Sequence, residues 1–135
     1  MTPPPHASAI LIEIGAGELI DRLSILEIKV ERLVDAAQRK NVRTELDSLK
    51  ALMRAHCPQS AEMERLAAAL KKVNETLWVV EDRLRELEAK QDFGEEFVKL
   101  ARSVYHQNDK RSALKREINE LTGARRIEEK IYAAY

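Results

Sequence analysis

The sequence predicts an all-α protein: an antiparallel helical hairpin in a coiled-coil-like bundle of about four helices, with a short C-terminal helix and a short extended N-terminal segment. Gly and Pro number only four each in 135 residues, which is too few for the turns of a sandwich or barrel of short strands. Hydrophobic residues make up 44% of the chain, enough to build a core. Through most of the chain, apolar residues recur at the spacing of a helix face.

The N-terminal end divides into a tail and an extended segment. Residues 1–8, which contain three consecutive prolines, are expected to be disordered, and residues 9–135 to form a single helical domain. Residues 9–14, AILIEI, are rich in β-branched side chains, but no second run of this kind follows. The segment therefore either packs across a helix or pairs as a strand with another copy or another protein.

The first predicted helix follows Gly15, the expected N-cap, with Glu18 in the first turn, where a carboxylate suits the helix dipole. Its main apolar stripe consists of Leu19, Leu23, Leu26, Val30 and Leu33. Ile25 and Ile28 fall on the opposite side, and a helix with two apolar faces is usually covered on both. We expect the second cover to be the 10–14 segment or a second subunit. The candidates for self-association are Ile10, Ile12, Ile14, Ile25 and Ile28.

A second helix is predicted to end at Pro58. The apolar spacing fails near Gln38–Asn41, where we expect a break or kink between the first and second helices. The spacing resumes at Val42, Leu46, Leu49 and Met53.

The clearest pattern predicts the hairpin. Its first seam consists of Met63, Leu66, Leu70, Val73, Leu77, Val80, Leu84 and Leu87. These residues alternate steps of three and four without a miss, as in a coiled coil. Asp92 is expected to cap the next helix with Glu95 in a capping box, and Gly123 to end it. The short link makes the two helices, at about 60–90 and 93–122, antiparallel. Residues 124–135 are expected to form the short final helix.

One polar layer interrupts this seam, around residues 105–111. In an antiparallel pairing Arg111 faces Val73, and polar and aromatic side chains of both helices meet there. Such a layer can fix register or oligomeric state, and Arg111→Leu would then be neutral or stabilising. Alternatively it is a binding site, because buried polar groups are costly unless satisfied. The candidates for binding a ligand or partner are Asn74, Trp78, Glu81, Arg102, Tyr105, Asn108, Asp109, Arg111 and Lys115.

Charge and cysteine content limit the partners and the compartment. Lys plus Arg and Asp plus Glu each number 23, so the chain lacks the positive charge of a general nucleic-acid binder. No apolar run reaches the roughly 18 residues of a membrane span, and no secretory signal is recognisable. The single cysteine, Cys57, cannot form an internal disulfide. We therefore expect a cytoplasmic protein.

Carboxylate pairs are the remaining chemical signal. Glu18 with Asp21, and Glu117 with Glu120, stand three residues apart and would share a helix face that could hold Mg²⁺ with a substrate phosphate. Among 23 acidic residues such pairs also arise by chance. Zinc-ligand spacing, a phosphate loop and a dinucleotide fingerprint are absent from the sequence. We expect no metal and no cofactor, and the pattern names no catalytic residue.

Four stretches carry a resemblance to a known family: GELIDRLSILEIKVERL (17–33), NETLWVVEDRLRELE (74–88), FVKLARSVYHQNDKRSALKREIN (97–119) and EEKIYAAY (128–135). In them the chain resembles a family of short bacterial helical proteins known as a domain of unknown function. The resemblance extends over nearly everything after residue 9. It implies no activity and no catalytic residues.

Three functions fit these patterns. The first is a non-catalytic helical interaction or assembly module, expected to form a homodimer and to bind a protein partner or ligand at the polar layer. The second is a small helical enzyme or binding protein for an anionic, for example phosphorylated, substrate, with Arg102, Arg111 and Lys115 as its cations. The third is a metal-dependent phosphohydrolase using the carboxylate pairs. A pocket lined by Trp78, Tyr105 and Arg111 would favour the second function, and a filled layer the first.

Overall fold

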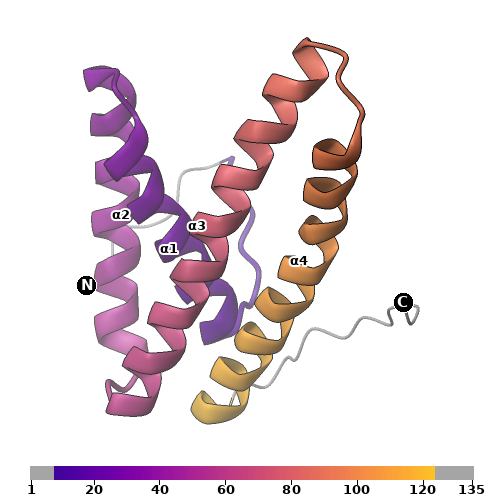
Figure 1. Ribbon diagram of the computed structural model, residues 1–135. Helices are drawn as coiled ribbons and strands as arrows, with labels where there is room; N and C mark the ends of the chain where they lie inside the picture. Colours follow the sequence, from indigo (N-terminus) through magenta and orange to yellow (C-terminus); the bar gives the residue numbers. More distant parts are fainter. Residues whose placement is uncertain (1–7, 124–135) are drawn as a thin grey trace.

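Four helices make up most of the protein in a computed structural model that describes residues 8–123 (Figure 1). They are α1 (Ala16–Arg32), α2 (Ala36–His56), α3 (Ala61–Ala89) and α4 (Glu95–Thr122). These helices account for 82% of the described residues, among which there is no strand. The predicted all-helical bundle is therefore confirmed. The expected final helix at 124–135, and the expected tail apart from Ser8, lie outside the described residues.

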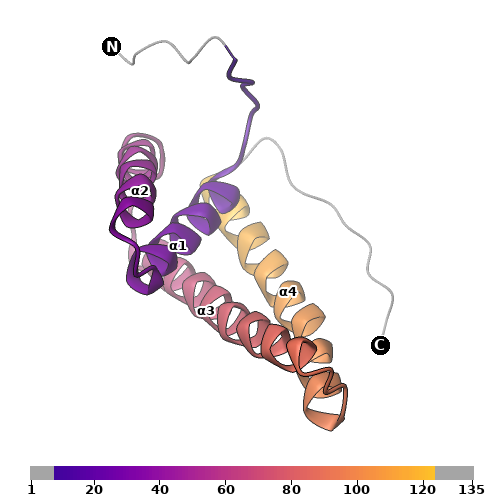
Figure 2. The same ribbon diagram turned by 90° about the horizontal axis from the view of Figure 1, so that it is seen from above.

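α3 and α4 form the predicted hairpin and lie side by side in both views (Figures 1 and 2). At the start of α3, the Ser60 hydroxyl accepts a hydrogen bond from the Met63 backbone N–H at 3.0 Å. α4 ends at Gly123, whose φ of 68° is a left-handed conformation that glycine adopts without strain. The prediction that Asp92 caps α4 is wrong. Gly94 is the N-cap, and its backbone N–H donates a hydrogen bond to the Asp92 carboxylate at 3.2 Å.

The connection between α1 and α2, residues 33–35, comes earlier than the break predicted near Gln38–Asn41. Asp35 explains the difference, because its side chain accepts a hydrogen bond from the Gln38 N–H at 2.8 Å and so caps α2. The apolar spacing fails later because the first turns of α2 face solvent. α2 ends before Pro58, as predicted.

α1 is the central helix and contacts each of the other three. Figure 2 shows it between α2 on one side and the α3–α4 hairpin on the other. The predicted stripe on α1 is buried, and on the second face Ile28 is only 1% exposed while Ile25 is half-buried. Ile28 is therefore covered within one chain, whereas Ile25 stays partly exposed and remains a candidate for contact with a second subunit.

The core lies where α1 passes between α2 and the hairpin. Its buried residues are Leu19, Ile20, Leu23, Leu26, Val30, Leu46, Cys57, Met63, Leu66, Leu70 and Ile118. The distal half of the hairpin extends away from α1 and α2 (Figure 2). With only two helices there, several seam residues are half-buried: Leu77, Leu84, Phe97, Leu100 and Val104. The molecule thus has a four-helix end that contains the main core cluster and a two-helix end in which Val80 and Leu87 are buried but most seam residues are only half-buried.

Candidate functional site

A buried polar junction, formed by Asp21, Ser24, Asn74 and Arg111, joins α1, α3 and α4. The Asp21 carboxylate accepts two hydrogen bonds from the Arg111 guanidinium, at 2.9 Å from Nε and 2.5 Å from Nη2. The Asn74 amide donates to the same carboxylate at 2.9 Å and to the Ser24 hydroxyl at 2.7 Å. Asp21, Ser24 and Asn74 are all buried. The junction therefore ties three helices together inside the protein.

The polar groups of this junction satisfy one another. The Ser24 hydroxyl donates to the backbone carbonyl of Asp21 at 2.7 Å while accepting from Asn74. The planar guanidinium of Arg111 matches the two carboxylate oxygens, an arrangement that strengthens the pair and fixes its geometry. The charges of Asp21 and Arg111 cancel. Arg111 is thus committed to a neighbouring helix and does not offer its full positive charge to an anionic ligand.

Two further contacts extend the polar junction along α1 and α4. The Lys115 ammonium lies 2.8 Å from the Glu18 carboxylate, and the Gly17 backbone N–H donates to Asn119 Oδ1 at 2.8 Å. Arg111, Lys115 and Asn119 follow one another at intervals of four, so they lie on one face of α4. The hydrogen bond from Lys115 lowers the pKa of Glu18 below its usual value, against the opposing effect of burial.

Gly17 permits the close approach of α1 to α4. A Cβ atom at this position would clash with the backbone carbonyl oxygen of Lys115 and would lie 3.0 Å from Asn119 Oδ1. A clash with backbone cannot be relieved by a side-chain rotation. The absence of a side chain at Gly17 is therefore what brings the first turn of α1 into hydrogen-bonding distance of α4.

The structure uses the predicted carboxylate pairs differently from a metal site. Glu18 and Asp21 bind Lys115 and Arg111 respectively, and Glu120 lies 3.2 Å from Arg116. Within residues 8–123, no group of three or more His, Cys, Asp or Glu side chains is arranged to hold a metal ion. In this structure, the first acidic pair serves to attach α1 to α4.

A hollow of about 360 Å³ opens beside the polar junction. Its apolar wall comes from Ile25 and Ile28 of α1 and from Leu77 and the half-buried Trp78 of α3. Its polar lining consists of Asn74, Glu81, Asp82, Arg85 and Arg111. We refer to this space as the Trp78 hollow. It is of the size that small-molecule and side-chain pockets have in proteins, at the lower end of the usual range.

The predicted site residues are only partly brought together. Asn74, Trp78, Glu81 and Arg111 line the Trp78 hollow, and Lys115 lies one turn along α4 from Arg111. Tyr105 is not among the described residues that line the hollow, and its ring packs instead against His106 with centroids 5.1 Å apart. Asn108 and Asp109 are half-buried and are likewise not among those lining residues.

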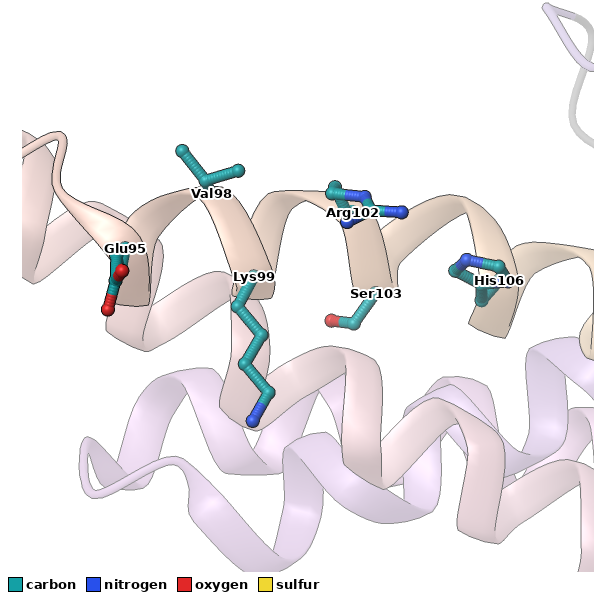
Figure 3. A pocket seen from close by; sticks show the side chains of 6 residues that line it. All are labelled: Glu95, Val98, Lys99, Arg102, Ser103 and His106. Carbon is teal, nitrogen blue, oxygen red and sulfur yellow. The ribbon is translucent and has the colours of Figure 1, made fainter. Parts of the chain in front are cut away.

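Arg102 belongs to a different surface. It lines a second hollow, of about 680 Å³, together with Glu95, Val98, Lys99, Ser103 and His106 (Figure 3). All six residues come from α4. The three cations proposed for an anionic substrate therefore do not form one site: Arg102 lies on this second surface, while Arg111 and Lys115 are paired with acids of α1.

Sequence reasoning did not assign Asp21, Ser24 and Asn119 to the polar layer. The sequence does contain a pattern that places Asp21 on the second apolar face of α1. Asp21, Ile25 and Ile28 follow the i, i+4, i+7 spacing of one helix face. One acid in phase with a second apolar stripe predicts a buried carboxylate that needs a cation. Asn119 carries no such signal, because its partner is a backbone N–H on another helix.

These features define an all-helical bundle protein whose first helix is fixed to a long helical hairpin by a buried ion pair. The chain belongs to the family of unknown function DUF6165, whose sequence profile matches residues 10–135. No curated protein and no solved structure matches the chain. Among residues 8–123, no helix has the length and hydrophobicity needed to cross a membrane.

Proposed function

We propose that this protein is a non-catalytic interaction and assembly module that forms a homodimer through residues 10–14. The observation that carries the proposal is the exposure of this segment. Ile10 is 89% exposed and Ile12 72%, and Leu11 and Ile14 are exposed as well. The segment leads away from α1 (Figure 2), and its residues 12–14 border a hollow formed with the ends of α2 and α4. Exposing these four aliphatic side chains to water costs free energy in a monomer, so their burial against a partner is favourable.

The second copy of the chain is the partner that suits this segment. An extended segment with β-branched side chains tends to pair along its backbone with another extended segment. The described residues of this chain contain no strand that could serve. Pairing of two identical segments gives a two-fold symmetric interface. In it, Ile10, Ile12 and Ile14 would lie on one side of the pairing, because alternate residues of a strand share a face.

The polar junction supports a structural scaffold rather than a reacting centre. Its buried groups bind one another, and this fixes α1 on the hairpin. Because α1 directly follows the 10–14 segment, a rigid α1 would present that segment in a defined place. We further propose that the module works in a reducing compartment such as the cytoplasm, since its one cysteine, Cys57, is buried and burial raises the pKa of its thiol.

The double variant Ile10→Asp/Ile12→Asp tests this function. Sedimentation equilibrium over a wide concentration range should show dimers for the wild type and monomers for the variant. Val34→Asp is the matched control, because Val34 is an exposed aliphatic residue in the α1–α2 connection at a different place. It should remain dimeric. Both variants should retain the helical circular dichroism of the wild type, since the replaced side chains are exposed. A monomeric wild type, or a dimeric Ile10→Asp/Ile12→Asp variant, would contradict the proposal.

A further inference from the structure

The charges around the Trp78 hollow are unbalanced toward the acidic side. Glu81 and Asp82 line it with Arg85, and among the described residues none of these three forms an ion pair within 4.0 Å. The guanidinium of Arg111 is already bound to Asp21. Two carboxylates thus face one uncommitted guanidinium, which leaves a net negative charge beside the hollow.

Trp78 adds a second attraction for a cation. Its indole ring forms part of the wall, and its N–H takes part in no hydrogen bond among residues 8–123. The face of an indole ring attracts ammonium and guanidinium groups more strongly than the other aromatic rings do. Ile25, Ile28 and Leu77 complete the wall with apolar surface. An aromatic face, an aliphatic wall and carboxylates at the edge match a cationic head on an apolar stem.

We propose that the Trp78 hollow binds an ammonium or guanidinium group carried on an apolar body. The cation lies against Trp78 and near Glu81 and Asp82, and the apolar part packs on Ile25 and Leu77. This reverses the sign of the ligand expected from the sequence, because two of the three cations counted there, Arg111 and Lys115, are bound to acids of α1 and the third, Arg102, lies on another surface. The site is separate from the 10–14 segment, so it stands or falls independently of dimer formation.

Trp78 is the only tryptophan of the chain, so its fluorescence reports on this hollow alone. Titration of the full chain with phenethylammonium, 2-phenylethanol and 3-phenylpropionate compares a cation, a neutral molecule and an anion of similar shape. The indole N–H resonance in NMR gives an independent readout. We expect a saturable change with phenethylammonium, affinity at least about fivefold lower for the alcohol, and the weakest response for the carboxylate.

Variants at the edge of the hollow should change the affinity for phenethylammonium in opposite directions. Glu81→Gln/Asp82→Asn should weaken phenethylammonium binding by about five- to tenfold, since each exposed charge contributes modestly. Arg85→Gln should strengthen it, because a repelling cation is removed. Glu64→Gln/Asp47→Asn removes the same charge from exposed positions on the first turn of α3 and on α2, and should change the affinity by less than twofold.

Two capped amino acids, N-acetyl-arginine methylamide and N-acetyl-lysine methylamide, separate the sources of the cation. Tighter binding of either than of phenethylammonium would support a side chain of a partner protein as ligand. Tighter binding of phenethylammonium would support a free amine. No saturable response to any of the three cations, preferred binding of 3-phenylpropionate, or weaker phenethylammonium binding by Arg85→Gln would overturn the proposal.

Discussion

Two arginine–carboxylate pairs, one midway along the hairpin and one near its turn, have the same geometry and different surroundings. Near the core, the Arg111 guanidinium binds both oxygens of Asp21, whose side chain is 2% exposed. Toward the distal end, the Arg83 guanidinium binds both oxygens of Glu96, at 3.0 and 2.7 Å. The side chain of Glu96 is 55% exposed. The two pairs thus differ chiefly in whether water can hydrate the carboxylate once the arginine is removed.

This difference shows that burial, and not hydrogen-bond geometry, decides how much each pair contributes to the stability of the fold. Without Arg83, Glu96 would be hydrated and would lose little. Without Arg111, Asp21 would stay buried with the Asn74 amide as its remaining side-chain partner, and a buried charge without a counter-ion is strongly destabilising. The two pairs also differ in what they fix in the fold. Of the two, the buried pair alone joins α1 to α4 and so fixes how the first helix lies on the hairpin.

Replacing Arg111 by leucine should give the largest effect. We expect Arg111→Leu to lower the free energy of unfolding by about 3–5 kcal/mol, because it leaves the Asp21 charge buried. The midpoint of thermal unfolding should fall by about 10 °C or more for a chain of this size. This replaces the neutral or stabilising effect expected from the sequence, where the seam showed Arg111 facing an apolar residue and did not show Asp21.

Two comparisons sharpen this result. Arg83→Leu should leave the midpoint close to that of the wild type. In an Asp21→Asn background, Arg111→Leu should cost much less than in the wild type, because no buried charge is left alone, and the difference measures the coupling of the pair. Equal losses from Arg83→Leu and Arg111→Leu would show that burial does not separate the two pairs.

The helices could be predicted from sequence because their causes are local. The seam spacing predicts a helix, and Pro58 and Gly123 mark helix ends, from neighbouring residues alone. These local signals were enough to predict the α3–α4 hairpin. The junction could be predicted only in part. Asn74 and Arg111 were recognised as polar interruptions of a seam, but the partner of Arg111 lies 90 residues away on a helix whose position the spacing does not determine. Long-range pairing of this kind depends on the tertiary arrangement.

Gly17→Ala should have the second-largest effect. The added methyl group would meet the Lys115 carbonyl oxygen, which belongs to the backbone of α4 and cannot rotate away. We expect a loss of about 1–3 kcal/mol in the free energy of unfolding as α1 is pushed from α4. Gly94→Ala is the control: there the near atom is an Asp92 side-chain oxygen at 3.3 Å, which can move. Its cost should stay below about 1 kcal/mol. A neutral Gly17→Ala would show that α1 and α4 can separate without loss.

The smallest expected effect is a pH dependence at the edge of the polar junction. The hydrogen bond from Lys115 lowers the pKa of Glu18 below its ordinary value of 4.5, so the folded protein favours the ionised carboxyl more than the unfolded chain does. The resulting stabilisation is fully present above about pH 4.5 and is lost as the pH falls through the lowered pKa.

Denaturant unfolding of the wild type and Glu18→Gln at a series of pH values measures this contribution. Because Glu18 is about one-third exposed, screening by solvent should keep the difference below about 1 kcal/mol at neutral pH. The difference should shrink toward zero in acid. At neutral pH it should be reduced, but not abolished, when Lys115→Met is the background, because the Arg22 guanidinium also binds Glu18 at 3.0 Å. A difference that stays constant from neutral pH into acid would mean that Glu18 acts through packing rather than through its charge, and that the ionic attachment of α1 to α4 rests on Asp21 alone.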